Sequence, residues 1–358
     1  MHRAMVKTMA VLALLVLVLG TGCRQSTQLP RRVTLQLNWL HDPTFAAHYL
    51  MAASQQGAER QVSIIEGGAN IDPLTQVLNG RADVAIVGAD IFLRYLDNQL
   101  GRNGNKESDL VCIFVEFQRN PVGWVLYLTD QRDISTLSKM DQKQLNKWVA
   151  DQIRRGKIVV GDKRGTETTA IWMRWAKIYG LDRITVRPVG FDPMIAINSR
   201  NMLFPVYLNE EPYKLKEKLR EKGGELVEID PYIDGVQLYG NVIVTRRETL
   251  KSNPELVKWY VSKLRESWKV IKADKEAFKK AVDEVAKYYT NVERSTLENQ
   301  VRRTMSFVFA DGIEEPGAMS EEKWKETLES LKVVGIVKNL TIEQVMQSVV
   351  PLLESDRK

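Results

Sequence analysis

Two patterns of apolar positions alternate along the chain from residue 33 onward. Short stretches in which every second residue is apolar, such as 33–37, or in which all residues are apolar, such as 84–87, are typical of strands. Most are followed by longer apolar runs with helical spacing, as in 45–55 and 166–179. Regular alternation of strands and helices predicts an α/β fold with a largely parallel sheet.

The pattern also indicates two lobes. Two apolar strands, 110–117 and 122–128, surround a polar turn and suit a crossing from one lobe to another. The stretch 226–245, interrupted by Pro231 and Gly235, predicts the return. We therefore expect a clamshell with a hinge, divided into lobe one (33–119), lobe two (120–232), and a second part of lobe one with the C-terminal helices (233–358).

A weak internal repeat supports this division. The segment DPLTQVLNGRADVAIVGAD, residues 72–90, resembles DPMIAINSRNMLFPVYLNE, residues 192–210. Each copy has Asp-Pro, a short apolar helix, a turn and a strand. Ligands of open α/β sheets bind at the carboxyl ends of the strands, so we expect each lobe to contribute a loop to one shared cleft.

The N-terminal segment is typical of exported proteins. Residues 1–22 combine a basic start with an apolar run that is too short to span a bilayer, which predicts a signal peptide. Cys23 follows directly and resembles the cysteine of a bacterial lipobox, so we expect lipidation there and a polar tether up to residue 32. A plain signal cleaved nearby, or an uncleaved anchor, is the alternative. The expected location is the extracytoplasmic face of the membrane or the periplasm.

Composition narrows the function. The 51 basic residues are interspersed among 45 acidic ones, without a basic stripe interleaved with aromatics, so no nucleic-acid partner is predicted. His41 and His48 have no Cys/His cluster around them, which predicts neither a metal nor another cofactor. No Ser-His-Asp order appears either, so an enzyme is not expected. We expect the chain to be a monomer. Cys112 fits a small buried apolar residue.

Five segments occur in a characteristic order: LNWLHDPTFAAHYLMA, DPLTQVLNGRADVAIVGAD, VGDKRGTETTAIWMRWAKIYGLD, FPVYLNEEP and GVQLYGNVIVTRRETLKSNPELVKWYVSKL. Together they resemble substrate-binding proteins of ABC importers in the NMT1/THI5-like group, over residues 33–289. The resemblance implies a two-lobed type II periplasmic-binding-protein fold with a hinge between lobes. It also implies two partners, a small-molecule ligand and an ABC permease in the membrane.

Some positions depart from that family. The first repeat keeps the turn Gly80-Arg-Ala-Asp83, whereas the second has Arg200-Asn-Met-Leu203 where Val-Asp is expected. His41 stands where proline is usual, and Phe45 where histidine is common. These changes leave the fold prediction intact and leave the choice of ligand open.

Nine residues are predicted to bind the ligand: Asn38, Trp39, Asp42, Asp90, Thr166, Thr168, Tyr207, Glu211 and Tyr239. Trp39 follows the first strand in a polar loop and offers a flat face for stacking; the resemblance implies that it stacks on the ligand's ring. Asn38 donates and accepts hydrogen bonds at once, which suits an aminopyrimidine edge. In the alternative interpretation, Trp39 is a core residue, Asn38 holds the backbone of a turn, and Asp42 caps the next helix.

The other candidates belong mostly to lobe two. Thr166 is the expected N-cap of a helix whose start favours acceptor groups, with Thr168 adding a hydroxyl; a cap without ligand is the alternative. The resemblance implies that Glu211 binds the edge of an aminopyrimidine and that Tyr207 packs on the ring of the same ligand. The alternative is that Glu211 only stabilises the start of its helix, where the helix dipole favours an acidic side chain. Tyr239 lies near the return crossing, and Asp90 ends the first repeat.

The favoured function is a lipid-anchored protein that delivers an aminopyrimidine thiamine precursor to an ABC importer. The same role for nitrate, sulfonate, taurine or a riboflavin-like ligand is the first alternative. Anions would need a positive cleft, built from Arg94, Arg164 or Arg174. The second alternative, a pyrimidine-synthesising enzyme, is disfavoured because the cysteine-rich iron motif of that branch is absent from the sequence.

Overall fold

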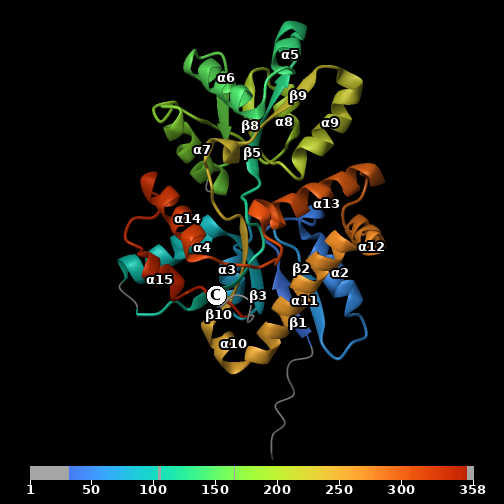
Figure 1. Cartoon of the computed structure of the whole chain (residues 1–358), viewed down its shortest axis with the longest axis vertical. Coiled ribbons are helices and arrows are strands. Elements are labelled where there is room, and N and C mark those ends of the chain that lie inside the picture. The colour runs from blue at the N-terminus through green and yellow to red at the C-terminus, as the bar shows by residue number, and fades with distance from the viewer. Residues whose placement is uncertain (1–31, 104–105, 165, 353–358) are drawn as a thin grey trace, which may run out of the picture. The chain divides into compact units, whose positions relative to one another are not determined.

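The computed structural model describes residues 32–103, 106–164 and 166–352 (Figure 1). The predicted signal peptide, Cys23 and the tether up to residue 31 lie outside these ranges. Within them, no helix has the length and apolar character needed to cross a membrane.

Sheet one has the strand order β2-β1-β3-β10-β4. Its strands are β1 Arg32–Gln36, β2 Gln61–Ile65, β3 Val84–Gly88, β4 Leu110–Val115 and β10 Asn241–Arg246. Strand β1 runs parallel to β2 and β3, whereas β10 runs antiparallel to β3 and β4. Both faces are buried, because Val84 and Ile86 pack into one apolar cluster and Ala85 and Val87 into another.

Sheet two has the order β7-β6-β8-β5-β9. It contains β5 Val122–Leu128, β6 Val159–Asp162, β7 Arg187–Pro188, β8 Met202–Tyr207 and β9 Glu225–Ile229. Strand β6 runs parallel to β7 and β8, and β5 runs antiparallel to β8 and β9. The two sheets therefore share one topology, and the predicted two-lobed α/β fold is confirmed.

The chain crosses between the sheets twice, from β4 to β5 and from β9 to β10. An ion pair between Arg119 and Asp230 joins the two connections. The lobe boundaries after residues 119 and 232 fall within these connections, and the division at those residues stays a prediction.

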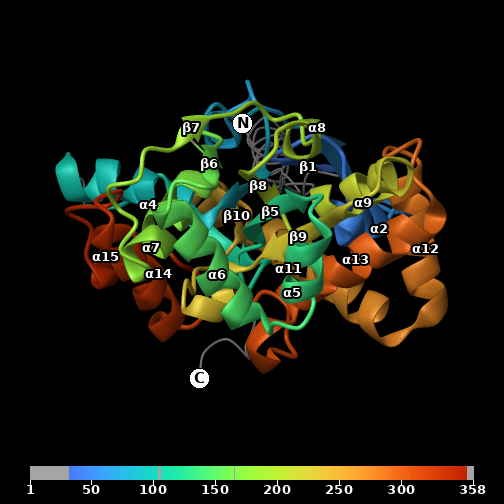
Figure 2. The ribbon, with the colours of Figure 1, turned by 90° about the horizontal axis from the view of Figure 1, so that it is seen from above.

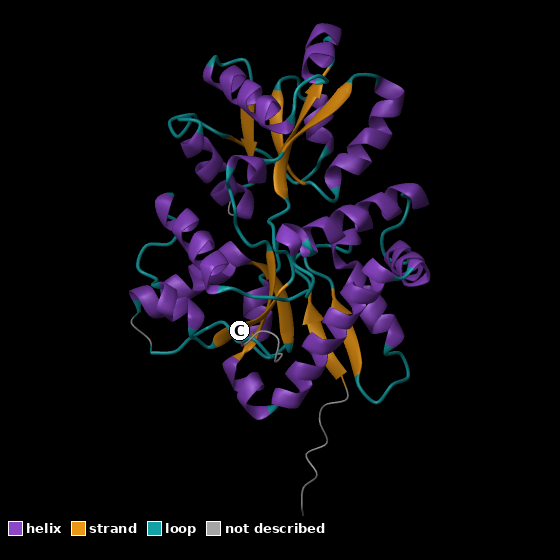
Figure 3. Cartoon of the chain, viewed as in Figure 1, coloured by secondary structure: helices purple, strands orange, loops and turns teal. Residues whose placement is uncertain are grey.

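Helices cover both faces of sheet one (Figure 3). One group comprises α2 Ala46–Ser54, α11 Pro254–Ala273, α12 Lys275–Ala286 and α13 Arg294–Val308. The other comprises α3 Pro73–Leu78, α4 Ala89–Leu96, α14 Glu321–Val333 and α15 Ile342–Met346. Figure 2, viewed along a perpendicular direction, places α2, α12 and α13 on the opposite side of the strands from α4, α14 and α15.

Sheet two is covered in the same way. Helices α6 Gln142–Arg154 and α7 Glu167–Ile178 pack on one face, and α8 Met194–Asn198 and α9 Glu211–Lys222 on the other. Two short helices, α5 Gln131–Leu137 and α10 Arg247–Ser252, follow strands β5 and β10. Cys112 is fully buried, as predicted.

The internal repeat has a structural counterpart. Asp72 Oδ1 accepts a hydrogen bond from Leu74 N at 3.1 Å, and Asp192 Oδ1 accepts one from Met194 N at 2.9 Å, so each aspartate holds the start of its short helix. In the turn, Gly80 has φ of 70° and Asn201 has φ of 58°. Asparagine tolerates this left-handed region better than most residues. The sequence at 200–203 departs from the family pattern, but it keeps the backbone conformation of the turn.

Two elements differ from expectation. The apolar residues of 184–189 favour a strand, but the pairing is confined to Arg187–Pro188, at the edge of sheet two. The C-terminal region from residue 253 onward was expected to be helical, but the start of α13 at Arg294 was not predicted; its N-cap position holds Glu293, which is not among the preferred capping residues. The usual sequence signal for a helix start is missing there.

Candidate functional site

A cavity of about 480 Å³ is lined by residues of both sheets. It lies where parallel strands end: Asn38 and Trp39 follow β1, Gly88 ends β3, Lys163 follows β6, and Tyr207 ends β8. This is the edge at which open α/β sheets bind ligands. The volume is within the range of small-molecule sites.

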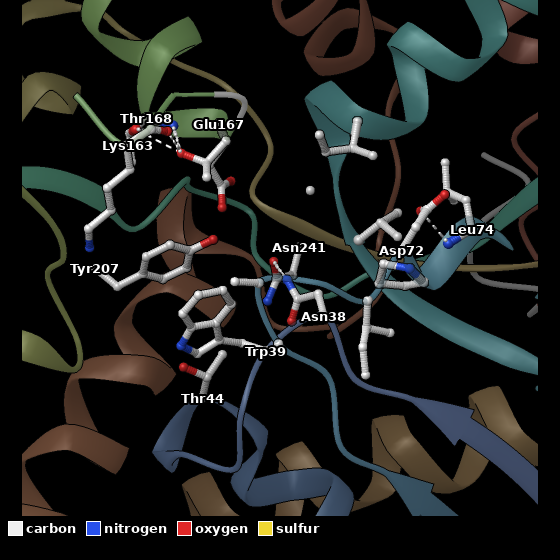
Figure 4. Close-up of a pocket in the computed structure, with 18 of the residues that line it drawn as sticks. Asn38, Trp39, Thr44, Asp72, Leu74, Lys163, Glu167, Thr168, Tyr207 and Asn241 are labelled. Atoms are coloured by element: carbon white, nitrogen blue, oxygen red, sulfur yellow. Dashed lines mark hydrogen bonds between the residues drawn. The ribbon is translucent and has the colours of Figure 1, made fainter. Parts of the chain in front are cut away.

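Seven of the nine predicted residues line this cavity: Asn38, Trp39, Asp42, Thr166, Thr168, Tyr207 and Glu211. Most of them are drawn in Figure 4. The structure thus brings together residues that lie up to 173 positions apart in the sequence, from Asn38 to Glu211. Their contact with a ligand stays a prediction.

Asp90 and Tyr239 are not among the residues that line the cavity, and their contact with the ligand stays a prediction. Asp90 is 3% exposed in the first turn of α4, behind Gly88. Tyr239 is 2% exposed; its ring packs 5.0 Å from that of Trp324, and its hydroxyl accepts a hydrogen bond from Ser320 N at 3.1 Å. The side chain of Tyr239 turns into the protein interior, whereas the Asp90 carboxyl lies beside Gly88 and near Glu167, both of which line the cavity.

Aromatic rings from both sheets flank the cavity. The Trp39 ring lies 5.0 Å from the ring of Phe191, tilted by 45°. Phe191 was not predicted, although the sequence carried a signal for it. It precedes Asp192-Pro193 in the second repeat as Ile71 precedes Asp72-Pro73 in the first, and both residues line the cavity.

Two asparagines form an amide pair within the cavity lining. Asn38 Nδ2 donates to Asn241 Oδ1 at 3.3 Å, as the dashed line in Figure 4 shows. Asn241 is the first residue of β10, only two positions beyond the predicted Tyr239. It was missed because the sequence does not reveal that β10 lies next to β3, close to the end of β1.

Lys163, Tyr207 and Glu211 form a bonded unit in sheet two. Glu211 Oε1 accepts from Lys163 Nζ at 2.8 Å, and Glu211 Oε2 accepts from Tyr207 N at 2.5 Å. Burial raises the pKa of Glu211 to about 7, opposed by the charge of Lys163. Both carboxylate oxygens therefore have protein partners, and Glu211 holds Lys163 and Tyr207 in place.

The start of α7 is also bonded internally. Thr166 caps the helix as predicted, its hydroxyl accepting from Thr168 N at 3.3 Å. The same hydroxyl donates to Lys163 O at 2.7 Å, and the Thr168 hydroxyl donates to Asp162 Oδ1 at 3.3 Å. These contacts order the loop that faces the cavity.

Acidic side chains outnumber basic ones in the lining: Asp42, Asp72, Glu167, Glu210 and Glu211 against Arg94 and Lys163. Burial raises the pKa of Asp42 and that of Glu167 to about 8, reinforced by the charges of Glu210 and Asp90 respectively. Asp42 Oδ1 accepts from Thr44 N at 2.7 Å, so it also caps the next turn. Such carboxyls hold protons at neutral pH and ionise readily beside a basic ligand.

Metal binding has little support in the part of the chain that the structure describes. There, no group of three or more His, Cys, Asp or Glu side chains is placed to hold a metal ion. His48 is fully buried, and its Nε2 lies 2.7 Å from Glu116 Oε1.

The fold and the cavity define a two-lobed periplasmic-binding type of protein. The family model described as NMT1/THI5 like matches residues 56–278, and the chain belongs to this family, as the sequence resemblance predicted. No curated protein sequence matches the chain.

Solved structures show the same fold at low sequence identity. The periplasmic aliphatic sulphonate binding protein SsuA of Escherichia coli has 13% identity and a TM-score of 0.60, over 90% of this chain and 92% of that one. The periplasmic nitrate-binding protein NrtA of Synechocystis PCC 6803 has 13% identity and a TM-score of 0.60, over 88% and 85%. The Candida albicans CA3427 gene product, described as having the generic periplasmic binding protein fold, has 10% identity and a TM-score of 0.56, over 89% and 96%.

Proposed function

We propose that the protein is the solute-binding component of an ABC importer and that it captures a small flat heterocycle, an aminopyrimidine thiamine precursor being the favoured ligand. The observation that carries the proposal is the cavity itself, which is built from both sheets and flanked by Trp39 and Tyr207. Aromatic faces suit a planar ring. The family membership and the fold agree with an import role.

The charges in the cavity favour an amine-bearing ligand over an anion. Lys163 already pairs with Glu211 at 2.8 Å. Burial raises the pKa of Asp90 to about 6, and the charge of Arg94 opposes this rise, so Arg94 is partly balanced within lobe one. Arg164 and Arg174 do not belong to the lining. Nitrate, sulfonate or taurine would meet more acidic than basic side chains, whereas an aminopyrimidine donates to them.

Capture follows from the two-sheet construction. The ligand's ring lies between Trp39 and Tyr207, Asn38 binds its edge, and the loop before Thr166 approaches from sheet two as the lobes close about the hinge. Glu211 acts by holding Tyr207 and Lys163 rather than by presenting a free oxygen. The closed form presents the surface that the permease recognises, and no chemical step on the ligand is involved.

Attachment to the membrane is part of the proposal, through lipid on Cys23. Cells that express the full chain are labelled with a lipid precursor and compared with cells that express Cys23→Ala. We expect label in the first and none in the second. Equal labelling, or none in either, contradicts the anchor and leaves the ligand proposal standing.

The ligand proposal is tested with the full chain in a mild detergent. Thermal unfolding is followed with 4-amino-2-methylpyrimidine, riboflavin, taurine and nitrate. A ligand at 100 times its dissociation constant stabilises the folded state by about 2.7 kcal/mol, so binding appears as a higher melting temperature. We expect a shift with the pyrimidine. A shift with taurine or nitrate and none with the pyrimidine contradicts the proposal.

A further inference from the structure

We propose that Asn241 acts with Asn38 as a two-point recognition element for the ligand, binding an edge on which a hydrogen-bond acceptor and a donor are adjacent. A ring nitrogen beside an amino group is such an edge. This inference rests on the proposed function, and it assigns to Asn241 a role in selecting the ligand.

The proposal is based on two buried polar atoms that lack hydrogen-bond partners among the described residues. Asn38 Oδ1 and Asn241 Nδ2 are both buried, and neither has a hydrogen-bond partner among the described residues. Asn241 as a whole is 1% exposed, and both residues line the cavity. Buried amide atoms in native proteins nearly always have partners. An unmet acceptor and an unmet donor that belong to one pair in the cavity therefore indicate that the ligand supplies the partners.

The pattern does not depend on how the two amides are oriented. Their mutual hydrogen bond uses one N–H donor and one carbonyl acceptor. If both side chains are turned over, the bond forms in the other direction, and again one acceptor and one donor remain. The amide pair therefore offers one acceptor and one donor in either case.

The backbone around Asn241 is firmly held. Its carbonyl oxygen accepts hydrogen bonds from Glu116 N at 2.9 Å and Phe117 N at 3.1 Å, at the start of the first crossing between the sheets. Asn241 also pairs with Gly88, the last residue of β3. Because its main chain is fixed on both sides, the side chain is preorganised for recognition. Its place beside the crossing connects ligand contact to the hinge.

The amide pair selects by chemistry. A 4-aminopyrimidine presents the amino N–H to an amide oxygen and the adjacent ring nitrogen to an amide N–H. The same ring with a methyl group in place of the amino group keeps its size and its acceptor but loses the donor. Sulfonate and nitrate offer acceptors only, so the amide oxygen would stay unmet and the ligand would lose affinity.

The experiment uses two matched probes, 4-amino-2-methylpyrimidine and 2,4-dimethylpyrimidine, titrated calorimetrically into the full chain. We expect the wild type to bind the amino compound about tenfold more tightly, the size of one well-formed hydrogen bond. Asn241→Leu is similar in volume but cannot form hydrogen bonds, and we expect it to weaken both compounds by about tenfold, because the ring nitrogen that Asn241 Nδ2 binds is present in both. In Asn38→Leu, which removes the acceptor for the amino group, we expect the ratio to fall close to one. Unchanged affinities for both compounds in Asn241→Leu overturn the inference and leave the proposed function intact.

Asn146→Leu is the matched control. Asn146 is fully buried away from the cavity, and its Nδ2 donates to Asp230 O at 2.8 Å and Asp234 Oδ2 at 2.6 Å. We expect this variant to lower the melting temperature and to leave both affinities, and therefore the tenfold ratio, unchanged. A changed ratio in Asn146→Leu contradicts the assignment of selectivity to the amide pair.

A second measurement needs no ligand. Because Asn241 Nδ2 has no partner in the unliganded protein, Asn241→Leu is expected to lower the melting temperature much less than Asn146→Leu. An equal or larger loss shows that Asn241 is structural and overturns the inference. If the wild type binds neither probe, the proposed ligand is wrong, while a small loss in Asn241→Leu still supports a recognition role for the amide pair.

Discussion

The two walls of the cavity share one topology and differ in how their polar groups are bonded. The sheet-one wall, formed by Asn38, Trp39, Asp42 and Asn241, contains an unmet acceptor and an unmet donor. In the sheet-two wall, formed by Lys163, Thr166, Thr168, Tyr207 and Glu211, the side-chain oxygens of the two threonines and Glu211 are bonded to neighbours of the same wall or to Asp162.

This difference indicates a division of labour. A wall with unmet polar atoms gains hydrogen bonds when a ligand arrives, so it contributes specificity. A wall whose groups are already bonded keeps its shape, and it contributes a surface that closes on the ligand. The same strand order has thus produced one recognising wall and one closing wall.

The largest expected effect concerns the stability of the sheet-two wall. Lys163→Met leaves Glu211 without its cation, and the two side chains are only 7% and 12% exposed. We expect the free energy of unfolding in urea to fall by about 3 kcal/mol, because a buried carboxylate without a partner is costly. The double variant Lys163→Met/Glu211→Gln should lose less than the sum of the single losses.

Lys279→Met is the control for this change, since Lys279 pairs with Glu276 at 2.7 Å on the surface. Exposed pairs contribute little to stability, because solvent screens their charges. If Lys163→Met costs no more than Lys279→Met, the bonded unit does not hold the sheet-two wall together.

The next effect compares the aromatic rings of the two sheets. Trp39→Ala should weaken binding of the aminopyrimidine by about 2 kcal/mol, roughly thirtyfold, because tryptophans in ligand contacts dominate affinity. Phe191→Ala should weaken it less, since Phe191 is 41% exposed. Calorimetric titration measures both. A larger loss for Phe191→Ala would assign the stacking role to sheet two.

The third prediction concerns pH and involves one carboxyl from each wall. Burial raises the pKa of Asp42 from 3.8 and that of Glu167 from 4.5 to about 8. Between about pH 4 and pH 8 these two carboxyls therefore bind more protons in the native state than in the unfolded state. Their contribution to the free energy of unfolding is most favourable below about pH 4 and decreases as the pH rises towards 8. The slope is at most about 1.4 kcal/mol per pH unit for each carboxyl.

Urea unfolding at pH 5, 6, 7 and 8 measures this slope. Asp42→Asn removes one of the two groups and should make the profile flatter than that of the wild type. A profile that is as steep in the Asp42→Asn variant as in the wild type rules out Asp42 as a source of the pH dependence.

The smallest effect tests the buried position of Tyr239. Tyr239→Phe removes the hydroxyl that accepts from Ser320 N. We expect a loss of about 1 kcal/mol in unfolding free energy and an unchanged affinity for the aminopyrimidine, because the side chain does not line the cavity. A clear loss of affinity would return Tyr239 to the site.

The sequence was sufficient for the fold because its signals are local. Period-two strands, helical runs and the repeated Asp-Pro units recur in both sheets, and Asp72 and Asp192 hold their helices in the same way. Trp39 and Thr166 were found for the same reason, since a strand end and a helix cap can be recognised from adjacent residues.

The rest of the site depends on contacts between distant segments. Asn241 reaches the cavity because β10 lies beside β3. The carboxylate of Glu211 already accepts a hydrogen bond from Lys163, which lies 48 positions earlier in the sequence. Tyr239 follows the right motif, but its side chain turns inward and packs on Trp324. Neither strand order nor side-chain direction is contained in local patterning.

The central claim is that the sheet-one wall recognises an acceptor–donor edge of an amine-bearing heterocycle. Its most direct test is competitive calorimetry on the full chain with 4-amino-2-methylpyrimidine, 2,4-dimethylpyrimidine and taurine. The amino compound should bind about tenfold more tightly than the dimethyl compound, and taurine should not displace it. Tighter binding of taurine, or equal binding of the two pyrimidines, would contradict the claim.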